Sequence, residues 1–172
     1  MVDIFKKRRA VRHYLPKLVT KKKIKQILTA AMYAPSGYNK HPLHFIIVRR
    51  NEIKEKLSQT NQWSSYVDKA AAIIIVCAND KQSMVWLEDA SIAVGYMWLK
   101  CTQLGLGACW IHIHGSLRIN KGKSEEYVKQ LLKIPANLRV VCFLAIGYPI
   151  EKPLFHSEAE YLNKKVHYEK WP

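Results

Sequence analysis

Residues 71–78, AAIIIVCA, decide the fold of this chain, because they are apolar without interruption. A short apolar run rich in β-branched residues is typical of a strand that is covered on both of its faces. Residues 140–146 show a second buried strand, and residues 43–49 and 108–113 are also predicted as strands. Buried central strands need helices on each side of the sheet, so the sequence predicts a layered α+β or α/β sandwich.

Helical periodicity occupies the segments between these strands. Helices are predicted at residues 2–12, 20–34, 52–57, 84–104 and 124–132. Thr20 can cap the second helix, and Pro16 is expected to end the first, because proline interrupts the hydrogen-bond ladder. The helix at 84–104 is apolar on more than one face, which predicts that it is buried, with an interface between subunits as one explanation.

The length of 172 residues allows one domain with a sizeable core, and residues 1–172 are expected to form a single domain. No apolar run approaches the ~18 residues of a membrane span, and the basic N-terminus lacks an apolar signal core. The four cysteines lie in apolar runs without a CxxC spacing, which predicts reduced, buried thiols in a cytoplasmic protein. Residues 150–172 have no clear period, so we expect this C-terminal arm to dock on a second subunit.

The charge is strongly basic and unevenly distributed. The chain carries 28 Lys and Arg against 13 Asp and Glu, a net charge of +15. Residues 1–26 alone hold ten bases and one acid, a net of +9. Such a concentration favours an anion-binding surface, for nucleic acid or for a phosphorylated small molecule, and a solvated basic helix is the plain alternative.

Three local motifs could contact a ligand. On a helix, Arg8 and Arg12 would share a face, where two guanidiniums can clamp a phosphate or stabilise negative charge on an electron-accepting ring. Solvated helix charge is the alternative interpretation. The loop Pro35–Asn39 could meet the polar edge of a heterocycle, although a plain helix-stop turn explains that segment better on its own. Gly105 and Gly107 follow a helix rather than a strand, which argues against a dinucleotide-binding fold.

Two further chemistries find little support. His112 and His114 would share one face of a strand, as metal ligands could, but no third ligand lies nearby, and no metal is predicted. The chain has no GxSxG motif, and no spacing places a base beside Cys109. These absences disfavour a hydrolase with a serine or cysteine nucleophile.

Taken in order, four segments resemble the nitroreductase family of flavoenzymes, and the resemblance runs from about Phe5 to Pro149. The residues that carry it are Arg8-Arg9-Ala10-Val11-Arg12 for the family pattern RRSxR, residues 30–42 (AAMYAPSGYNKHP) for AAxxAPSGxNxQP, residues 89–111 for the long helix ending in GLGxCWI, and residues 140–149 for the strand ending in GYP. The chain looks like the short-chain branch of that family.

The resemblance implies an α+β nitroreductase-like fold, with a central mixed sheet covered by helices on both faces. It also implies an intertwined homodimer that binds FMN at the subunit interface. Arg8 and Arg9 would meet the FMN phosphate, and Arg12 would lie near the pyrimidine side of the ring and stabilise its reduced, anionic form. The backbone from Trp110 to Ile113 would line the ring near N5, where a hydride arrives.

Further residues complete the cofactor set that the resemblance implies. The partner subunit would contribute Ser36, Gly37 and Asn39. The full predicted set is Arg8, Arg9, Ala10, Arg12, Pro35, Ser36, Gly37, Asn39, Trp110, Ile111 and His112, with no side chain acting as a catalytic acid or base because the cofactor carries the chemistry.

The chain departs from the family pattern at three places. Ala10 stands where the family usually has serine, and His41 stands where it usually has glutamine. The family often supplies a late lysine or arginine to the phosphate, whereas residues 156–163 are acidic here and only Lys164 and Lys165 follow. These departures predict a weakened hold on the cofactor and argue against a phosphate contact from the tail.

The activity implied by the resemblance is a ping-pong flavin oxidoreductase that takes a hydride from NADH or NADPH and reduces nitroaromatics, quinones or flavins. A specialised FMN enzyme, of the dehalogenating or flavin-fragmenting type, is an alternative, but only residues 60–69 are available for the lid that such enzymes usually carry. A flavin-binding protein without turnover and a basic nucleic-acid-binding module are the remaining alternatives.

Overall fold

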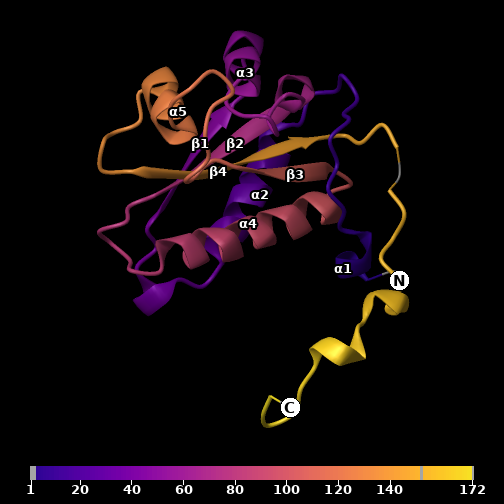
Figure 1. Ribbon diagram of the computed structural model, residues 1–172. Helices are drawn as coiled ribbons and strands as arrows, with labels where there is room; N and C mark the ends of the chain where they lie inside the picture. Colours follow the sequence, from indigo (N-terminus) through magenta and orange to yellow (C-terminus); the bar gives the residue numbers. More distant parts are fainter. Residues whose placement is uncertain (1–2, 152, 172) are drawn as a thin grey trace.

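The computed structural model describes residues 3–151 and 153–171, and a four-stranded sheet forms its centre (Figure 1). The strand order is β1-β2-β4-β3, and each neighbouring pair is antiparallel. The strands are β1 (Leu43–Val48), β2 (Ala72–Ala78), β3 (Gly107–His112) and β4 (Arg139–Gly147). Every residue of β2 is buried, which confirms the interpretation of its unbroken apolar run.

Helices cover both faces of this sheet, as predicted (Figure 1). The helices are α1 (Ile4–Lys7), α2 (Lys21–Met32), α3 (Asn51–Ser58), α4 (Trp86–Gln103) and α5 (Ser124–Leu132). Short 3-10 turns lie at Gly37–Asn39, Val67–Lys69, Glu158–Glu160 and Asn163–Lys165. Because side chains alternate along β2, Ile74 and Val76 pack under α2 and α4, whereas Ile73 and Ile75 face the side of α3 and α5.

The predicted first helix is too long. Residues 2–12 were expected to be helical, but α1 ends at Lys7, and its start at residue 2 lies outside the described residues. From Arg8 onward the chain is extended, and Ala10 forms a parallel bridge with Ala108 beside β3. Within the described residues this bridge is the one parallel pairing, so the sheet is mixed only there. Backbone hydrogen bonding to a sheet edge outweighs the helical propensity of the basic segment.

Helix α4 is buried on one side only within the described chain. One side packs against the sheet through Ala90, Val94 and Met97, but Ile92 and Tyr96 on the other side are each 42% exposed. An apolar helix with one exposed apolar side is typical of an interface with another chain. Within the described chain, the side of α4 that carries Ile92 and Tyr96 is therefore not covered, and only a second chain could bury it.

None of the helices in residues 3–151 and 153–171 combines the length and the apolar character that crossing a membrane requires.

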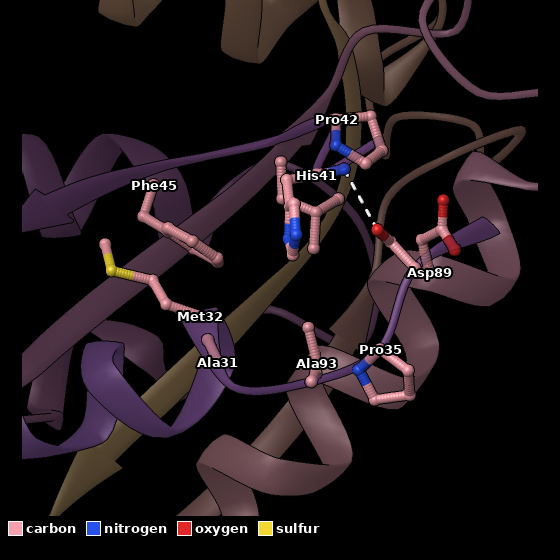
Figure 2. Close-up of a pocket in the computed structure, with 11 residues that line it drawn as sticks. Ala31, Met32, Pro35, His41, Pro42, Phe45, Asp89 and Ala93 are labelled. Atoms are coloured by element: carbon pink, nitrogen blue, oxygen red, sulfur yellow. Dashed lines mark hydrogen bonds between the residues drawn. The ribbon is translucent and has the colours of Figure 1, made fainter. Parts of the chain in front are cut away.

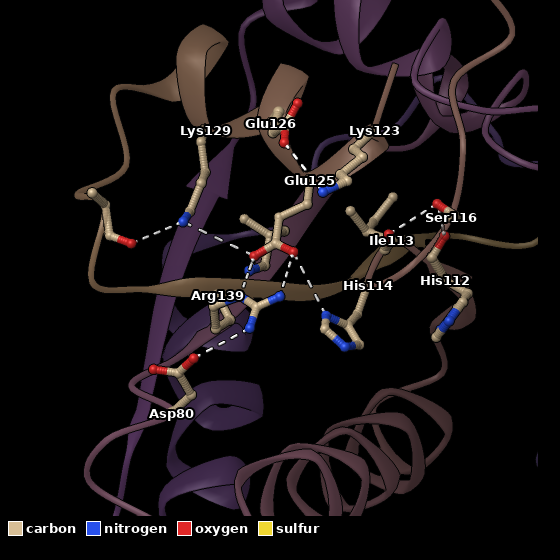
Figure 3. Close-up of polar contacts among 12 residues, drawn as sticks. Asp80, His112, Ile113, His114, Ser116, Lys123, Glu125, Glu126, Lys129 and Arg139 are labelled. Atoms are coloured by element: carbon tan, nitrogen blue, oxygen red, sulfur yellow. Dashed lines mark hydrogen bonds and ion pairs between the residues drawn. The ribbon is translucent and has the colours of Figure 1, made fainter. Parts of the chain in front are cut away.

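A buried carboxylate joins α5 to the sheet (Figure 3). Arg139 donates to both Glu125 oxygens, at 2.8 and 3.0 Å, and the Val140 N–H donates to the same carboxylate at 3.0 Å. Arg139 also donates to Asp80 at 3.2 Å, which ties in the loop after β2. Burial opposes ionisation of Glu125, but these donors outweigh it, so the pKa of this carboxyl lies below its ordinary value.

We expect Glu125→Gln to lower the free energy of unfolding by about 1.5–3 kcal/mol at pH 7, because a charge-assisted, bidentate contact is lost. The lowered pKa makes this stabilisation present above the unfolded-state pKa and lost as the pH falls through the folded-state value. Urea unfolding at pH 7 and near pH 3 measures it. Glu126→Gln is the matched control, since Glu126 is exposed and makes only a 3.7 Å pair with Lys123. Equal losses in the two variants would contradict the assignment.

Candidate functional site

The segment that carries the basic motif is held flat against the outer edge of the sheet. The Val11 N–H donates to the Ala108 carbonyl at 3.0 Å, and the Tyr14 hydroxyl donates to the carbonyls of Val11 and Ala145 at 2.5 and 3.2 Å. A Cβ atom on Gly107 would lie 2.6 Å from Val11, so glycine is what permits this close approach. Residues 8–14 are therefore placed by the sheet and not by a helix.

Arg8 and Arg9 meet the C-terminal tail at His156. The His156 Nε2 atom lies 3.1 Å from the Arg8 guanidinium and 3.0 Å from the Arg8 carbonyl, and Nδ1 lies 3.2 Å from Arg9. The Arg8 guanidinium also stacks over the Trp98 ring at 4.9 Å from its centroid. Three basic side chains thus converge on one point, as an anion site requires.

The tail reaches this point by folding back along α1. The His156 N–H donates to the Lys6 carbonyl at 2.8 Å, and Lys6 forms an ion pair with Glu158. Glu160 lies 2.6 Å from His156 Nδ1, and the hydrogen bond from His156 lowers the pKa of this carboxyl. The sequence analysis considered only the lysines of the tail and its acidic character, and so it did not anticipate that His156 would lie against Arg8 and Arg9. The spacing of His156 and Glu160, four residues apart, was the sequence feature that could have indicated this contact.

Arg12 lies at a cavity beside the outer edge of β3. The cavity has a volume of about 440 Å³, and its lining residues are Arg12, Gln62, Trp63, Ser65, Tyr66, Trp110 and His112. Burial and a hydrogen bond with Cys109 raise the pKa of Tyr66, whereas Arg12 acts in the opposite direction. The wall is therefore a neutral phenol beside a permanent cation, with tryptophan and histidine rings around them.

Strand β3 presents alternate residues to this cavity. Trp110 and His112 line it, but the Ile111 side chain is 1% exposed and packs in the core on the opposite side. Only the backbone of Ile111 could line a ligand, which is the part of this residue that the resemblance assigns to the ring. The Ala108 and His112 carbonyls accept bonds from outside the sheet, and by the two-residue repeat the Trp110 N–H also points outward.

The second predicted segment lies elsewhere, in the loop before β1 (Figure 2). Ser36 Oγ accepts a bond from the His41 N–H at 2.9 Å, and the Gly37 N–H donates to the buried carboxylate of Asp89 at 2.7 Å. Tyr38, Asn39 and His41 have φ values of 50°, 56° and 46°, in the left-handed region that non-glycine residues rarely adopt. Strain held by specific contacts is common at functional sites.

This loop borders an apolar pocket of about 200 Å³ (Figure 2). Its lining residues include Pro35, Ser36, Pro42, Phe45 and Ala93. The loop leads into β1 and Arg12 lies beside β3, and these are the two opposite outer strands of the sheet. One chain therefore does not bring the two halves of the predicted cofactor set together.

The two histidines considered as metal ligands have different surroundings. His112 lines the cavity beside Arg12, whereas His114 packs edge-on against Trp86 and lies 3.6 Å from Glu125 (Figure 3). Across residues 3–151 and 153–171, no three His, Cys, Asp or Glu side chains are grouped as a metal site.

Comparisons with known proteins find similar sequences and similar structures. A family model described as "Nitroreductase family" matches residues 5–65 and 61–148. The structure of an FMN-dependent nitroreductase from Clostridium difficile R20291 superposes with a TM-score of 0.93, at 34% identity over 99% of this chain and 100% of that chain. A protein of Archaeoglobus fulgidus, provisionally described as an NADH dehydrogenase/NAD(P)H nitroreductase, is 32% identical over 95% of this chain and 94% of its own length. An iodotyrosine deiodinase of Thermotoga neapolitana is 26% identical, over 87% of this chain and 88% of its own.

We expect Tyr14→Phe to lower the free energy of unfolding by about 1–2 kcal/mol, because two carbonyl acceptors lose their donor. Hydrogen exchange at the Val11 amide should also become faster, since the hydroxyl holds this segment on β3. Tyr33→Phe is the control, because Tyr33 is exposed. Unchanged exchange at Val11 would show that the tyrosine does not position the basic segment.

Proposed function

Because the chain belongs to the nitroreductase family, we propose that it is an FMN-dependent oxidoreductase that oxidises NADH or NADPH and reduces nitroaromatics, quinones or flavins. The observation that carries this proposal is the pairing of a cation cluster at Arg8, Arg9 and His156 with the aromatic cavity beside Arg12. Both lie along one extended segment and one strand edge, as a ligand with an anionic end and a flat ring requires.

The residues present fit FMN at both ends. Two guanidiniums and an imidazole offer several donors to a phosphate dianion, and forked contacts of this kind are strong. The ring end has a permanent cation, an outward strand edge and the indole of Trp110, which suit the polar rim and the flat face of an isoalloxazine. Ala10, in the place usual for serine, offers the cofactor only its methyl group.

The chain's own residues bind and orient in this proposal, and bound FMN supplies the hydride and electron transfer. Arg12 provides a fixed positive charge at the ring end, which favours the accumulation of negative charge there. Trp63 and Tyr66 contribute aromatic rings to the wall of the cavity, against which a flat ligand can pack. Donor and acceptor would use the same cavity in turn, because it is the opening next to the strand edge.

The proposed assembly is a homodimer in which each site takes residues from both chains. Ser36, Gly37 and Asn39 would come from the partner, since the loop that holds them lies at the far edge of its own sheet. The exposed apolar side of α4 and the left-handed residues of the loop support an interface at these places.

The tail is proposed as an arm of the single domain formed by residues 1–172. It leaves the body beside α1 and extends away from it (Figure 1). Its large apolar side chains are exposed, and they are Leu154, Phe155, Tyr161, Leu162, Val166, Tyr168 and Trp171. So many exposed apolar groups on an extended segment support docking on a second subunit. We also place the protein in the cytoplasm, because its four cysteines, all in the described part of the chain, are buried and unpaired.

A dehalogenating enzyme of the same fold is the second candidate, and the similarity to an iodotyrosine deiodinase favours it. Residues 60–69 form a short turn and one 3-10 helix, which leaves little chain for a lid over the cavity. We therefore favour general reduction at an open site. A flavin-binding protein without turnover would have the same residues and would differ only in failing to react with NADH or NADPH.

The proposal is tested by incubating the purified protein with FMN, desalting it and recording the visible spectrum, then adding NADH or NADPH anaerobically. A retained flavin band that bleaches with either nucleotide supports an oxidoreductase. A retained band that does not bleach supports binding without turnover, and a colourless protein contradicts the proposal.

Arg12→Ala should raise the dissociation constants of FMN and riboflavin alike, by about 10-fold, because Arg12 contacts the ring in this proposal. Arg9→Ala should weaken FMN by a similar factor and leave riboflavin unchanged, because riboflavin has no phosphate. Fluorescence titration of each flavin measures both. Lys25→Ala, which removes one charge from the exposed side of α2, should change neither constant. If Arg12→Ala binds both flavins normally, the role assigned to Arg12 is wrong.

Ile92→Glu should convert the protein from a dimer of twice 20.0 kDa to a monomer, because it buries a charge in the proposed α4 interface. Sedimentation equilibrium measures the mass. Gln130→Glu adds the same charge to the exposed side of α5, on the other face of the sheet, and should remain dimeric. A wild-type mass of 20.0 kDa would refute the dimer.

A further inference from the structure

We propose that a second cavity, between Trp63 and residues 115–119, selects electron acceptors that are planar aromatic molecules with an anionic substituent, and that Arg118 binds the anion. The proposal rests on the proposed function, because the acceptor must reach a flavin held beside Arg12. It goes further by naming the acceptor class and the residues that choose it.

The cavity opens directly onto the proposed flavin site. Both cavities share the lining residues Gln62, Trp63 and His112. The second cavity has a volume of about 670 Å³, larger than the 440 Å³ beside Arg12. A small aromatic molecule in it could place its reducible group toward Arg12 and its far end toward Arg118.

The walls of this cavity suit a flat apolar ring. Trp63, Leu117 and Ile119 all line it and are all more than half exposed, at 55%, 71% and 59%. Exposed large apolar side chains gathered around one cavity are typical of a ligand site. Trp63 offers a face for stacking, and such aromatic pairs contribute beyond the area that they bury.

The charge of the cavity favours an anion. Arg118 is its permanent cation, and among the described residues neither Asp nor Glu lines it. The Arg118 guanidinium makes no ion pair with any carboxylate in residues 3–151 and 153–171. Its Nε atom is buried and lacks a hydrogen-bond partner among the described residues, so a ligand in the cavity would be bound by the terminal nitrogens of the guanidinium, which carry the remaining N–H donors.

Arg118 is also held in position before any ligand arrives. Its guanidinium carbon lies 3.9 Å from the centroid of the Tyr127 ring on α5. The backbone N–H of Arg118 donates to the Gly122 carbonyl at 2.9 Å. Leu117 and Lys123 form an antiparallel β-bridge across the same turn. Glu125 anchors α5 to β4, so the platform under Arg118 is part of the core (Figure 3). A guanidinium fixed in this way loses little freedom on binding an anion.

The test compares 4-nitrobenzoate with 4-nitrobenzamide as acceptors for the FMN-loaded protein, because the two differ in charge but hardly in shape. We expect the wild type to show a KM about 10-fold lower for the benzoate, and Arg118→Gln to reduce this ratio to about 1. Arg118→Lys, which keeps the charge without the fork, should give an intermediate ratio. Lys121→Gln is the matched control, since Lys121 is exposed in the same turn but does not line the cavity.

A binding measurement without turnover separates this proposal from the proposed function. Benzoate, which cannot be reduced at this site, is titrated calorimetrically into wild type and Arg118→Gln, and the affinity should fall about 10-fold in the variant. Failure to retain flavin would overturn the proposed function, whereas flavin retention with equal benzoate affinities would overturn the role of Arg118. A third outcome would also overturn the proposal: Arg118→Gln changes the preference between NADPH and NADH but leaves the KM ratio of 4-nitrobenzoate to 4-nitrobenzamide at the wild-type value. Arg118 would then bind the phosphate of the hydride donor and not the anionic group of the acceptor.

Discussion

The hydrogen bond from the Val11 N–H to the Ala108 carbonyl is the constraint on which the site depends. It converts a basic segment that could have been helical into an extended chain along the outer edge of β3. Extended geometry carries Arg8 and Arg9 to one end of the segment and Arg12 to the other, with the strand edge between them. Glycine at 107 allows the approach, because any Cβ atom there would overlap Val11.

Electrostatics explains why the acidic tail lies where it does. Arg8 and Arg9 lie close together, and repulsion between them is costly without a counter-charge. The tail supplies one through Glu160, which reaches the pair by way of His156, while Glu158 pairs with Lys6 beside them. The two contacts of the glutamates, with His156 and with Lys6, are exposed and worth little individually. A phosphate entering this cluster would therefore exchange a weak internal counter-charge for a stronger one.

The candidate residues are divided between opposite edges of the sheet, which is why the proposed site would need a second chain. The loop before β1 is strained at Tyr38 and Asn39 and is stabilised by Asp89, whose buried carboxylate accepts from the Gly37 N–H. In the described part of the chain, that loop leads into β1, and β2 and β4 separate this strand from β3. An exposed apolar side on α4 and an extended apolar tail are the other features that a single chain leaves without partners.

The sequence by itself determined the layered sheet and the family, because unbroken apolar runs such as Ala72–Ala78 and ordered motifs are local properties. It also determined the Thr20 cap and the bounds of α5, which depend on neighbouring residues. Only the tertiary structure decided that the helix ends at Lys7, that Ile111 faces the core and that His156 meets Arg8. These outcomes depend on contacts between segments far apart in the chain, and local propensity contains no information about which distant partner a backbone group or a charge will find.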